Sequence, residues 1–214
     1  MNIRKELSHS FYKQETQTQS WHLIVAMIFL ALLVYLTFRD ISENQFVDWD
    51  DYTYVIDNDL VRAPGDNYLK DLFSTPIASN FHPLTILSLT VNDNICPDCA
   101  EGISPRPFIT VNIIIHLLNA ILVLLLCHLL YRKNFLPALF VSIVFAIHPM
   151  HIESVAWISE RKDVLYSFFF LFGLITWLMY KKRQGRTWLI LTFILFTFSC
   201  LSKATAVVFP LVLI

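Results

Sequence analysis

Apolar residues occur in long uncharged runs along this chain, and short polar segments separate the runs. A helix that crosses about 30 Å of hydrocarbon needs roughly 20 mostly apolar residues, because no water is present there to satisfy its backbone. The pattern therefore predicts five membrane-spanning helices. Their apolar runs are Trp21–Phe38, Pro107–Tyr131, Asn134–Ile152, Val164–Tyr180 and Thr187–Ser202. A further run, Ala204–Ile214, is too short to span and is interpreted as the start of a sixth helix.

The runs divide the chain into four parts. We expect a cytoplasmic tail over residues 1–20, a first transmembrane helix over 21–38, an outer loop over 39–106, and helices two to five with the start of a sixth over 107–214. No small-residue cleavage site follows Phe38, so the first helix is expected to remain as an anchor. Because the last apolar run stops in mid-pattern, the chain is interpreted as a fragment of a longer protein.

Basic residues indicate how the helices are oriented. They cluster before the first span, after the second and after the fourth, as Arg4, Lys5, Lys13, Arg132, Lys133, Lys181, Lys182, Arg183 and Arg186. Short cytoplasmic segments of membrane proteins carry an excess of Lys and Arg. The N-terminus is therefore predicted to be cytoplasmic, and the outer loop, the turn between spans three and four, and the bend at Lys203 are predicted to share the opposite face.

Composition supports an all-α polytopic membrane protein. Hydrophobic residues make up 56% of the chain and charged residues 15%, against about 45–50% and 25% in soluble proteins. The net charge of −1 gives no reason to expect a nucleic-acid partner. Within the outer loop, the segment Tyr68–Val91 mixes aromatic and aliphatic residues and is compatible with a helix in the membrane interface. Cys96 and Cys99 are interpreted as a local disulfide or as two free thiols.

Adjacent carboxylates follow the first span. Asp50 and Asp51, with Asp48 two residues earlier, lie between aromatic residues at the predicted membrane surface. Such a cluster can supply a general base, or it can hold a divalent cation through oxygen ligands. The alternative is a solvated acidic turn, and both interpretations stay open. No cofactor is assigned, and a divalent metal ion at Asp50 and Asp51 is one alternative.

The turn between spans three and four carries a second group of polar residues. His148, His151 and Glu153 are of metal-ligating type, but the helical HExxH arrangement of zinc proteases is absent. Arg161 and Lys162 follow on the predicted outer face, where a guanidinium and an ammonium group suit a phosphate. The alternative is a capped turn whose charges pair with one another.

Two further polar features lie within or beside apolar runs. Asn112, His116 and Asn119 share one face of the second span, and hydrogen bonding between helices is the simpler interpretation of this stripe. Lys203 interrupts an apolar stretch and either extends to the interface or binds an anionic headgroup. Since the carboxylates, the His148–Asp163 turn and Lys203 share one predicted face, a lipid-linked phosphate substrate at the outer leaflet would fit them.

Five strings in the sequence resemble a known family. They are Phe46–Val55, His82–Ser88, Asn112–Asn119, His148–Leu165 and Leu201–Ala204. They are similar to the membrane part of the transmembrane and tetratricopeptide-repeat O-mannosyltransferases, and more closely to bacterial relatives with C-terminal tetratricopeptide repeats. Both groups are members of the GT-C superfamily of membrane glycosyltransferases. The resemblance covers roughly residues 46–214.

This resemblance implies transfer of a mannose-like sugar from a polyprenyl- or dolichyl-phosphate donor to a hydroxyl acceptor, with protein Ser/Thr as the expected class. It also implies a carboxylate base in the first outer loop, a role that falls on Asp50 or Asp51. Asp48 departs from the Asn that relatives often carry there. Arg161, Lys162, Lys203, His148, His151 and Glu153 become the expected donor-binding residues. The bacterial plasma membrane is favoured, or the endoplasmic reticulum in a eukaryote. The competing hypothesis is a non-catalytic membrane scaffold for the repeats.

Overall fold

The structure, a computed structural model, describes residues 3–95, 103–131 and 135–213. Within these ranges the regular elements are all helical, apart from one isolated bridge between Ile77 and Asn80. The expectations for Cys96 and Cys99, and the basic pair Arg132 and Lys133, lie outside the described residues. The prediction of an all-helical architecture is confirmed.

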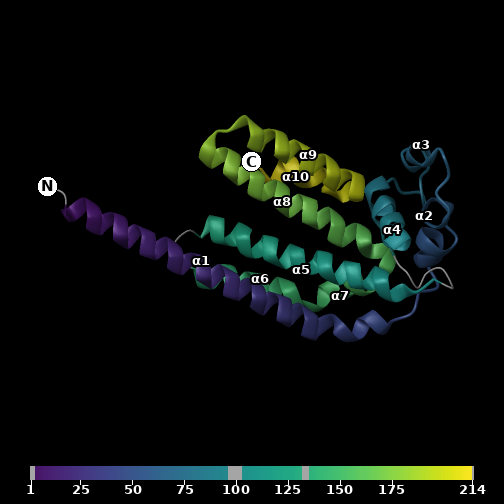
Figure 1. Ribbon diagram of the computed structural model, residues 1–214. Helices are drawn as coiled ribbons and strands as arrows, with labels where there is room; N and C mark the ends of the chain where they lie inside the picture. The colour runs from purple at the N-terminus through teal and green to yellow at the C-terminus, as the bar shows by residue number, and fades with distance from the viewer. Residues whose placement is uncertain (1–2, 96–102, 132–134, 214) are drawn as a thin grey trace.

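Five helices run alongside one another as an elongated bundle (Figure 1). They are α1 (Ile3–Phe38), α5 (Pro105–Leu130), α6 (Phe135–Ile147), α8 (Arg161–Arg183) and α9 (Arg186–Ser202). Three helical segments are long and apolar enough to cross a membrane, namely Trp21–Glu43, Pro105–Leu130 and Ile158–Arg183. A bent pair, Phe135–Ile147 with Pro149–Ala156, gives a fourth, whereas α9 is apolar but shorter. The chain is thus a polytopic helical membrane protein, and among the described residues three helices, or four with the bent pair, meet this criterion of length and composition.

Proline and turn residues explain where the helices end. The bend of 48° after α6 falls at His148-Pro149, because Pro disfavours helical geometry at the residue before it and provides no N–H. The chain then forms a turn (Pro149–His151), α7 (Ile152–Ala156) and a second turn (Ile158–Glu160) before α8. Helix α8 ends at Arg183, and the next residue, Gln184, is left-handed with φ 53°. After α9, a turn (Ala204–Val208) leads to α10 (Phe209–Val212).

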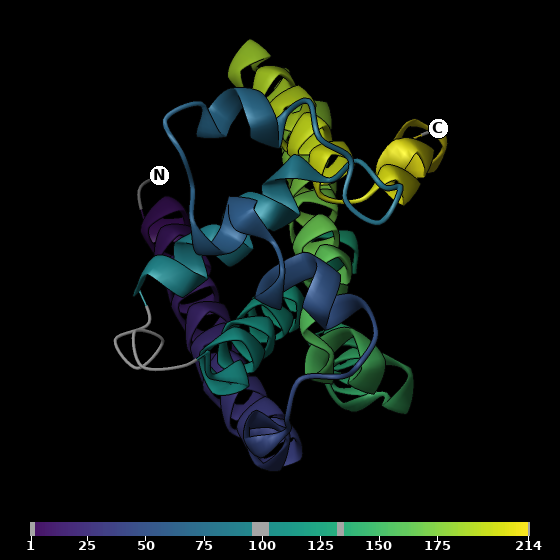
Figure 2. The ribbon, with the colours of Figure 1, turned by 90° about the vertical axis from the view of Figure 1, so that its right-hand side faces the viewer.

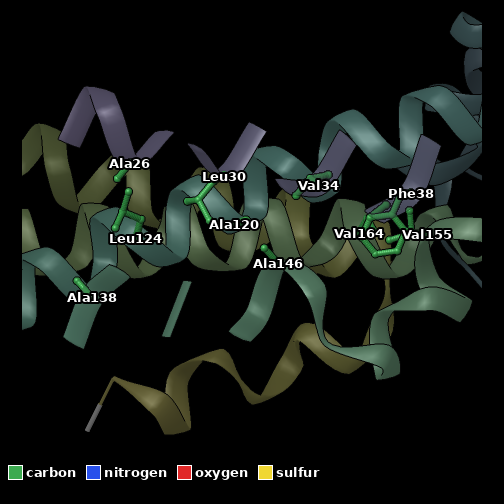
Figure 3. Packing of buried hydrophobic residues seen from close by; sticks show 10 residues of the cluster. All are labelled: Ala26, Leu30, Val34, Phe38, Ala120, Leu124, Ala138, Ala146, Val155 and Val164. Carbon is green, nitrogen blue, oxygen red and sulfur yellow. The ribbon is translucent and has the colours of Figure 1, made fainter. Parts of the chain in front are cut away.

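Small and aliphatic side chains form the core of the bundle (Figure 3). On α1, Ala26, Leu30, Val34 and Phe38 recur every four residues, so they form one buried stripe. The stripe belongs to a cluster that contains Ala120 and Leu124 of α5, Ala138 and Ala146 of α6, Val155 of α7, and Val164 of α8. Four of these ten residues are alanines, and small residues allow membrane helices to approach closely.

Residues 39–95, which we call the loop cap, fold over one end of the bundle (Figure 2). The loop cap contains two turns, Arg39–Glu43 and Tyr52–Ile56, and three helices, α2 (Asp59–Arg62), α3 (Tyr68–Leu72) and α4 (Pro83–Ile95). It has a hydrophobic core of its own, to which α5 and the turn before α8 also contribute. The buried members are Tyr54, Val55, Val61, Leu72, Ile77, Ile86, Leu89, Phe108, Ile109 and Ile158.

The loop cap differs from the expected single interfacial helix over Tyr68–Val91. The segment forms α3 and α4 instead, because Ala78 and Ser79 adopt left-handed backbone angles of 48° and 62° in φ between them. The hydroxyl of Tyr68 donates to Thr90 Oγ1 at 2.9 Å, which holds α3 against α4.

Candidate functional site

Asp51 is buried where the loop cap meets the bundle. One carboxylate oxygen accepts the Val47 N–H at 3.0 Å, and the other accepts the Ser159 N–H at 2.9 Å and the Ser159 hydroxyl. The residue is 1% exposed. Asp51 therefore joins the loop cap to the turn that precedes α8, and both of its oxygens are occupied by hydrogen bonds from the protein.

Asp50 has a different environment although it is the neighbouring residue. Its side chain is 44% exposed, and Oδ2 lies 4.0 Å from Nζ of Lys162. The two aspartates directly precede the helical turn Tyr52–Ile56, and successive helical residues point about 100° apart. The same geometry that buries one carboxylate therefore leaves the other at the surface.

Asp50 is the first of five charged residues of alternating sign, which we call the charge row. Nζ of Lys162 lies 2.8 Å from Oε1 of Glu160. Oε2 of Glu160 lies 3.8 Å from Nζ of Lys203, and Lys203 also forms an ion pair with Asp163. The row brings Asp50 of the loop cap together with Lys162 at the start of α8 and Lys203 after α9.

Arg161 is fully buried and does not take part in the charge row. Its guanidinium donates to the side-chain oxygens of Asn112 and Asn92, each at 2.8 Å, and to the carbonyls of Phe108 and Ser88 at 2.6 and 3.2 Å. These acceptors are neutral, and no carboxylate among the described residues forms an ion pair with Arg161. The residue thus joins α4, α5 and α8, with its donors directed to the protein.

The polar stripe on α5 bonds to backbone carbonyls of neighbouring segments. Nδ2 of Asn112 donates to the carbonyl of Trp157 at 3.1 Å, and Nδ2 of Asn119 donates to that of Val164 at 2.8 Å. Nε2 of His116 donates to the carbonyl of Ala146 at 3.0 Å. Three polar side chains on one helix face therefore connect α5 to α6, to α8 and to the segment between α7 and α8.

The structure places His148, His151 and Glu153 beside the bend after α6. His148 is exposed, and its Nδ1 accepts the Met150 N–H at 3.2 Å. The ring centroid of His151 lies 5.3 Å from that of His116. Glu153 is exposed on α7. In the part of the chain that the structure describes, no three His, Cys, Asp or Glu side chains gather closely enough to hold a metal ion.

Two residues beside the charge row were not singled out from the sequence. Tyr54 and His82 are buried with their rings stacked, 5.0 Å apart and 6° from parallel. Nζ of Lys162 lies 4.8 Å from the Tyr54 ring centroid. Burial raises the pKa of the Tyr54 hydroxyl. Burial, and to a smaller degree the charges of Lys162 and Lys203, lower the pKa of His82 to about 4.

These elements define a polytopic α-helical membrane protein with charged residues gathered where the loop cap meets the bundle. The chain is homologous to protein O-mannosyl-transferases over much of its length. It is 27% identical to TMTC4 of Mus musculus over 180 residues, or 75% of this chain and 24% of that protein. It is 30% identical to Tmtc1 of Drosophila melanogaster over 189 residues, or 83% of this chain and 20% of that protein.

A third relative, TMTC1 of Mus musculus, is 30% identical over 138 residues, which cover 60% of this chain and 14% of the relative. The chain therefore spans about a quarter or less of the length of these relatives. No family model matches the chain, and no solved structure matches it significantly.

Proposed function

We propose that this chain forms part of a membrane glycosyltransferase of GT-C type. The enzyme would move a mannose-like sugar from a polyprenyl- or dolichyl-phosphate donor to a hydroxyl group of a protein. The names of the relatives, protein O-mannosyl-transferases, support the sugar and the acceptor class. The single observation that carries the proposal is the half-exposed carboxylate of Asp50 beside Lys162.

Asp50, rather than Asp51, is proposed as the general base. A base must reach the proton that it removes. Asp51 has no exposed oxygen to offer, since the Val47 and Ser159 groups occupy both. Asp50 keeps an exposed carboxylate, and its Oδ2 lies 4.0 Å from Nζ of Lys162.

In the proposed reaction, the acceptor oxygen attacks the anomeric carbon while its proton passes to the Asp50 carboxylate. The bond between the anomeric carbon and the phosphate oxygen breaks, and its electron pair leaves with the phosphate. Lys162 and Lys203 would stabilise the charge that develops on this leaving group, because both ammonium groups lie in the charge row with Asp50. Arg161 would keep α4, α5 and α8 in position.

The loop cap is proposed to lie on the non-cytoplasmic face, with the N-terminus in the cytoplasm. The host membrane would be the bacterial plasma membrane, or the endoplasmic reticulum in a eukaryotic cell. A full-length protein with C-terminal tetratricopeptide repeats, as in the resembled family, would supply the further helices and the acceptor-binding part.

The test is sugar transfer from a labelled polyprenyl-phosphate mannose to a Ser/Thr peptide by the purified full-length protein. General-base assistance is worth about 10²–10⁴ in rate, so Asp50→Asn should lose at least 100-fold in kcat while the protein stays folded. Asp48→Asn is the matched control, because Asp48 is an exposed acid of the same segment. Full turnover by Asp50→Asn would refute the base assignment, and no transfer by the parent protein would favour the scaffold.

A further inference from the structure

Two buried polar atoms beside the charge row have no hydrogen-bond partner among the described residues. They are the hydroxyl of Tyr54 and Nε2 of His82. Tyr54 is fully buried, and His82 is 5% exposed. A buried polar group without a partner costs about 1–3 kcal/mol, and such groups are few in native proteins. Two of them on stacked rings indicate a partner from outside the described residues.

The fold places the Tyr54 ring beside Lys162 and the start of α4, which follows His82, beside the residue before Lys203. The Tyr54 ring lies under Nζ of Lys162, 4.8 Å from the centroid. His82 directly precedes α4, and in the first turn of that helix the Thr85 hydroxyl donates to the carbonyl of Ser202 at 2.9 Å. Because Ser202 adjoins Lys203 in sequence, this buried bond holds the start of α4 beside Lys203.

Two ammonium groups and one helix end provide positive charge at this place. Helix α4 is 13 residues long and begins at Pro83, so its positive end lies at His82. Lys162 and Lys203 add two ammonium groups, and their charges are the ones that reach His82. Glu160 and Asp163 form ion pairs with the same lysines, so an anion would be a further partner of ammonium groups that these carboxylates already hold in position.

Both unpartnered atoms can donate a hydrogen bond at neutral pH. Burial keeps the Tyr54 hydroxyl protonated, and the low pKa of about 4 keeps the His82 imidazole neutral. In the tautomer with its proton on Nε2, His82 donates from the unpartnered position. Hydrogen bonds to a charged acceptor are stronger than those between neutral groups.

We infer that the Tyr54 hydroxyl and His82 Nε2 bind the phosphate of the lipid-linked sugar donor, together with Lys162 and Lys203. This inference rests on the proposed function and adds two donor-binding residues to it. Lys162 would then lie between the base Asp50 and the phosphate that is bound beside the Tyr54–His82 pair.

Tyr54→Phe gives a sharp test, because it removes only the unpartnered oxygen. If that hydroxyl binds the phosphate, the KM for polyprenyl-phosphate mannose in the full-length protein should rise roughly 10-fold or more. Its melting temperature should stay close to that of the parent, since the ring and its stacking on His82 are kept. Tyr68→Phe is the matched control: its hydroxyl bonds to Thr90, so this variant should melt earlier and keep the parent KM.

A binding measurement separates this inference from the proposed function. Polyprenyl phosphate without a sugar should bind to the full-length parent, and His82→Gln and Tyr54→Phe should each weaken that binding by a similar factor. Equal binding and equal donor KM in parent and variants would overturn the inference while transfer continued. A raised KM for the acceptor peptide alone would also overturn it. A parent that neither binds the lipid nor transfers sugar would overturn both proposals.

Discussion

Ser159 donates its backbone N–H to the carboxylate of Asp51 across 108 residues of sequence, with an N–O distance of 2.9 Å. The Ser159 hydroxyl bonds to the same carboxylate oxygen. Because Asp50 directly precedes Asp51 and Lys162 lies three residues after Ser159, the contact also helps to set the distance between Asp50 and Lys162. The buried bond between Ser159 and Asp51 thus positions the partly exposed pair of Asp50 and Lys162.

Replacing Asp51 with Ala should destabilise the fold. The change leaves the Ser159 N–H and hydroxyl and the Val47 N–H without their acceptor, and each buried unsatisfied group costs about 1–3 kcal/mol. We expect a loss of roughly 2–4 kcal/mol in the free energy of unfolding, measured by denaturant or thermal unfolding in detergent. Asp48→Ala, at an exposed position, should leave stability within experimental error. An unchanged unfolding midpoint for Asp51→Ala would contradict the anchoring role.

Arg161→Lys should be strongly destabilising although it preserves the charge. A lysine cannot reproduce the planar set of donors that bonds to Asn112, Asn92 and Phe108. The expected loss is about 3 kcal/mol or more, with a lower yield of monodisperse protein on size-exclusion chromatography. Arg106→Lys, at an exposed site in the first turn of α5, is the control. Parent-like melting of Arg161→Lys would show that the buried bonds are dispensable.

His82 should make stability depend on pH on the acid side. Its pKa is about 4 in the folded protein and about 6.5 when unfolded, so between these values the unfolded state binds more protons. The contribution of the neutral His82 imidazole to stability is therefore complete above about pH 6.5. It is lost as the pH falls toward 4, where the free energy of unfolding drops by at most about 1.4 kcal/mol per pH unit. Unfolding free energies of the parent and of His82→Gln, measured from pH 4 to 7.5, should diverge with this slope. Parallel curves would argue against a buried neutral imidazole.

Gly173 on α8 should not tolerate a larger residue. A Cβ at this position would lie 3.0 Å from two ring atoms of Phe209, and that buried ring is packed against Phe170 and Phe196. Ala gains about 1 kcal/mol of helix propensity over Gly, but overpacking costs about 1–3 kcal/mol, so we expect a lower melting temperature. Gly65→Ala, with nothing within 4 Å, should be neutral. A higher melting temperature for Gly173→Ala would show that Phe209 moves at little cost.

The helical membrane class follows from the sequence because hydrocarbon imposes a length and a composition that few soluble helices meet. The position of the break in the third apolar run is harder to read. Residues 134–152 are uncharged throughout, and the Pro149 bend divides them into α6 and a separate turn. A hydropathy average over the whole run does not detect this bend. The backbone sterics of one residue, Pro149, determine where it falls.

The site was predictable in part for a similar reason. The adjacent acids Asp50 and Asp51 and the basic residues that follow the turn before α8 predicted a site with charged side chains. No local sequence pattern, however, distinguishes Asp50 from Asp51. The difference arises from Ser159, which only the folded chain brings near. Tyr54 and His82 resemble ordinary aromatic and loop residues in sequence, and their unpartnered atoms become visible only once the rings are stacked and buried.

Arg161 also has a consequence for the order of assembly. Its acceptors on Ser88, Asn92, Phe108 and Asn112 all precede it in the chain. During synthesis these hydrogen bonds of α4 and α5 therefore form only after the N-terminal end of α8 has been made. The loop cap and the bundle should then lose structure together, since pulling them apart strands a cation among neutral groups. A bundle helix that is made late in this way completes buried hydrogen bonds of helices made earlier.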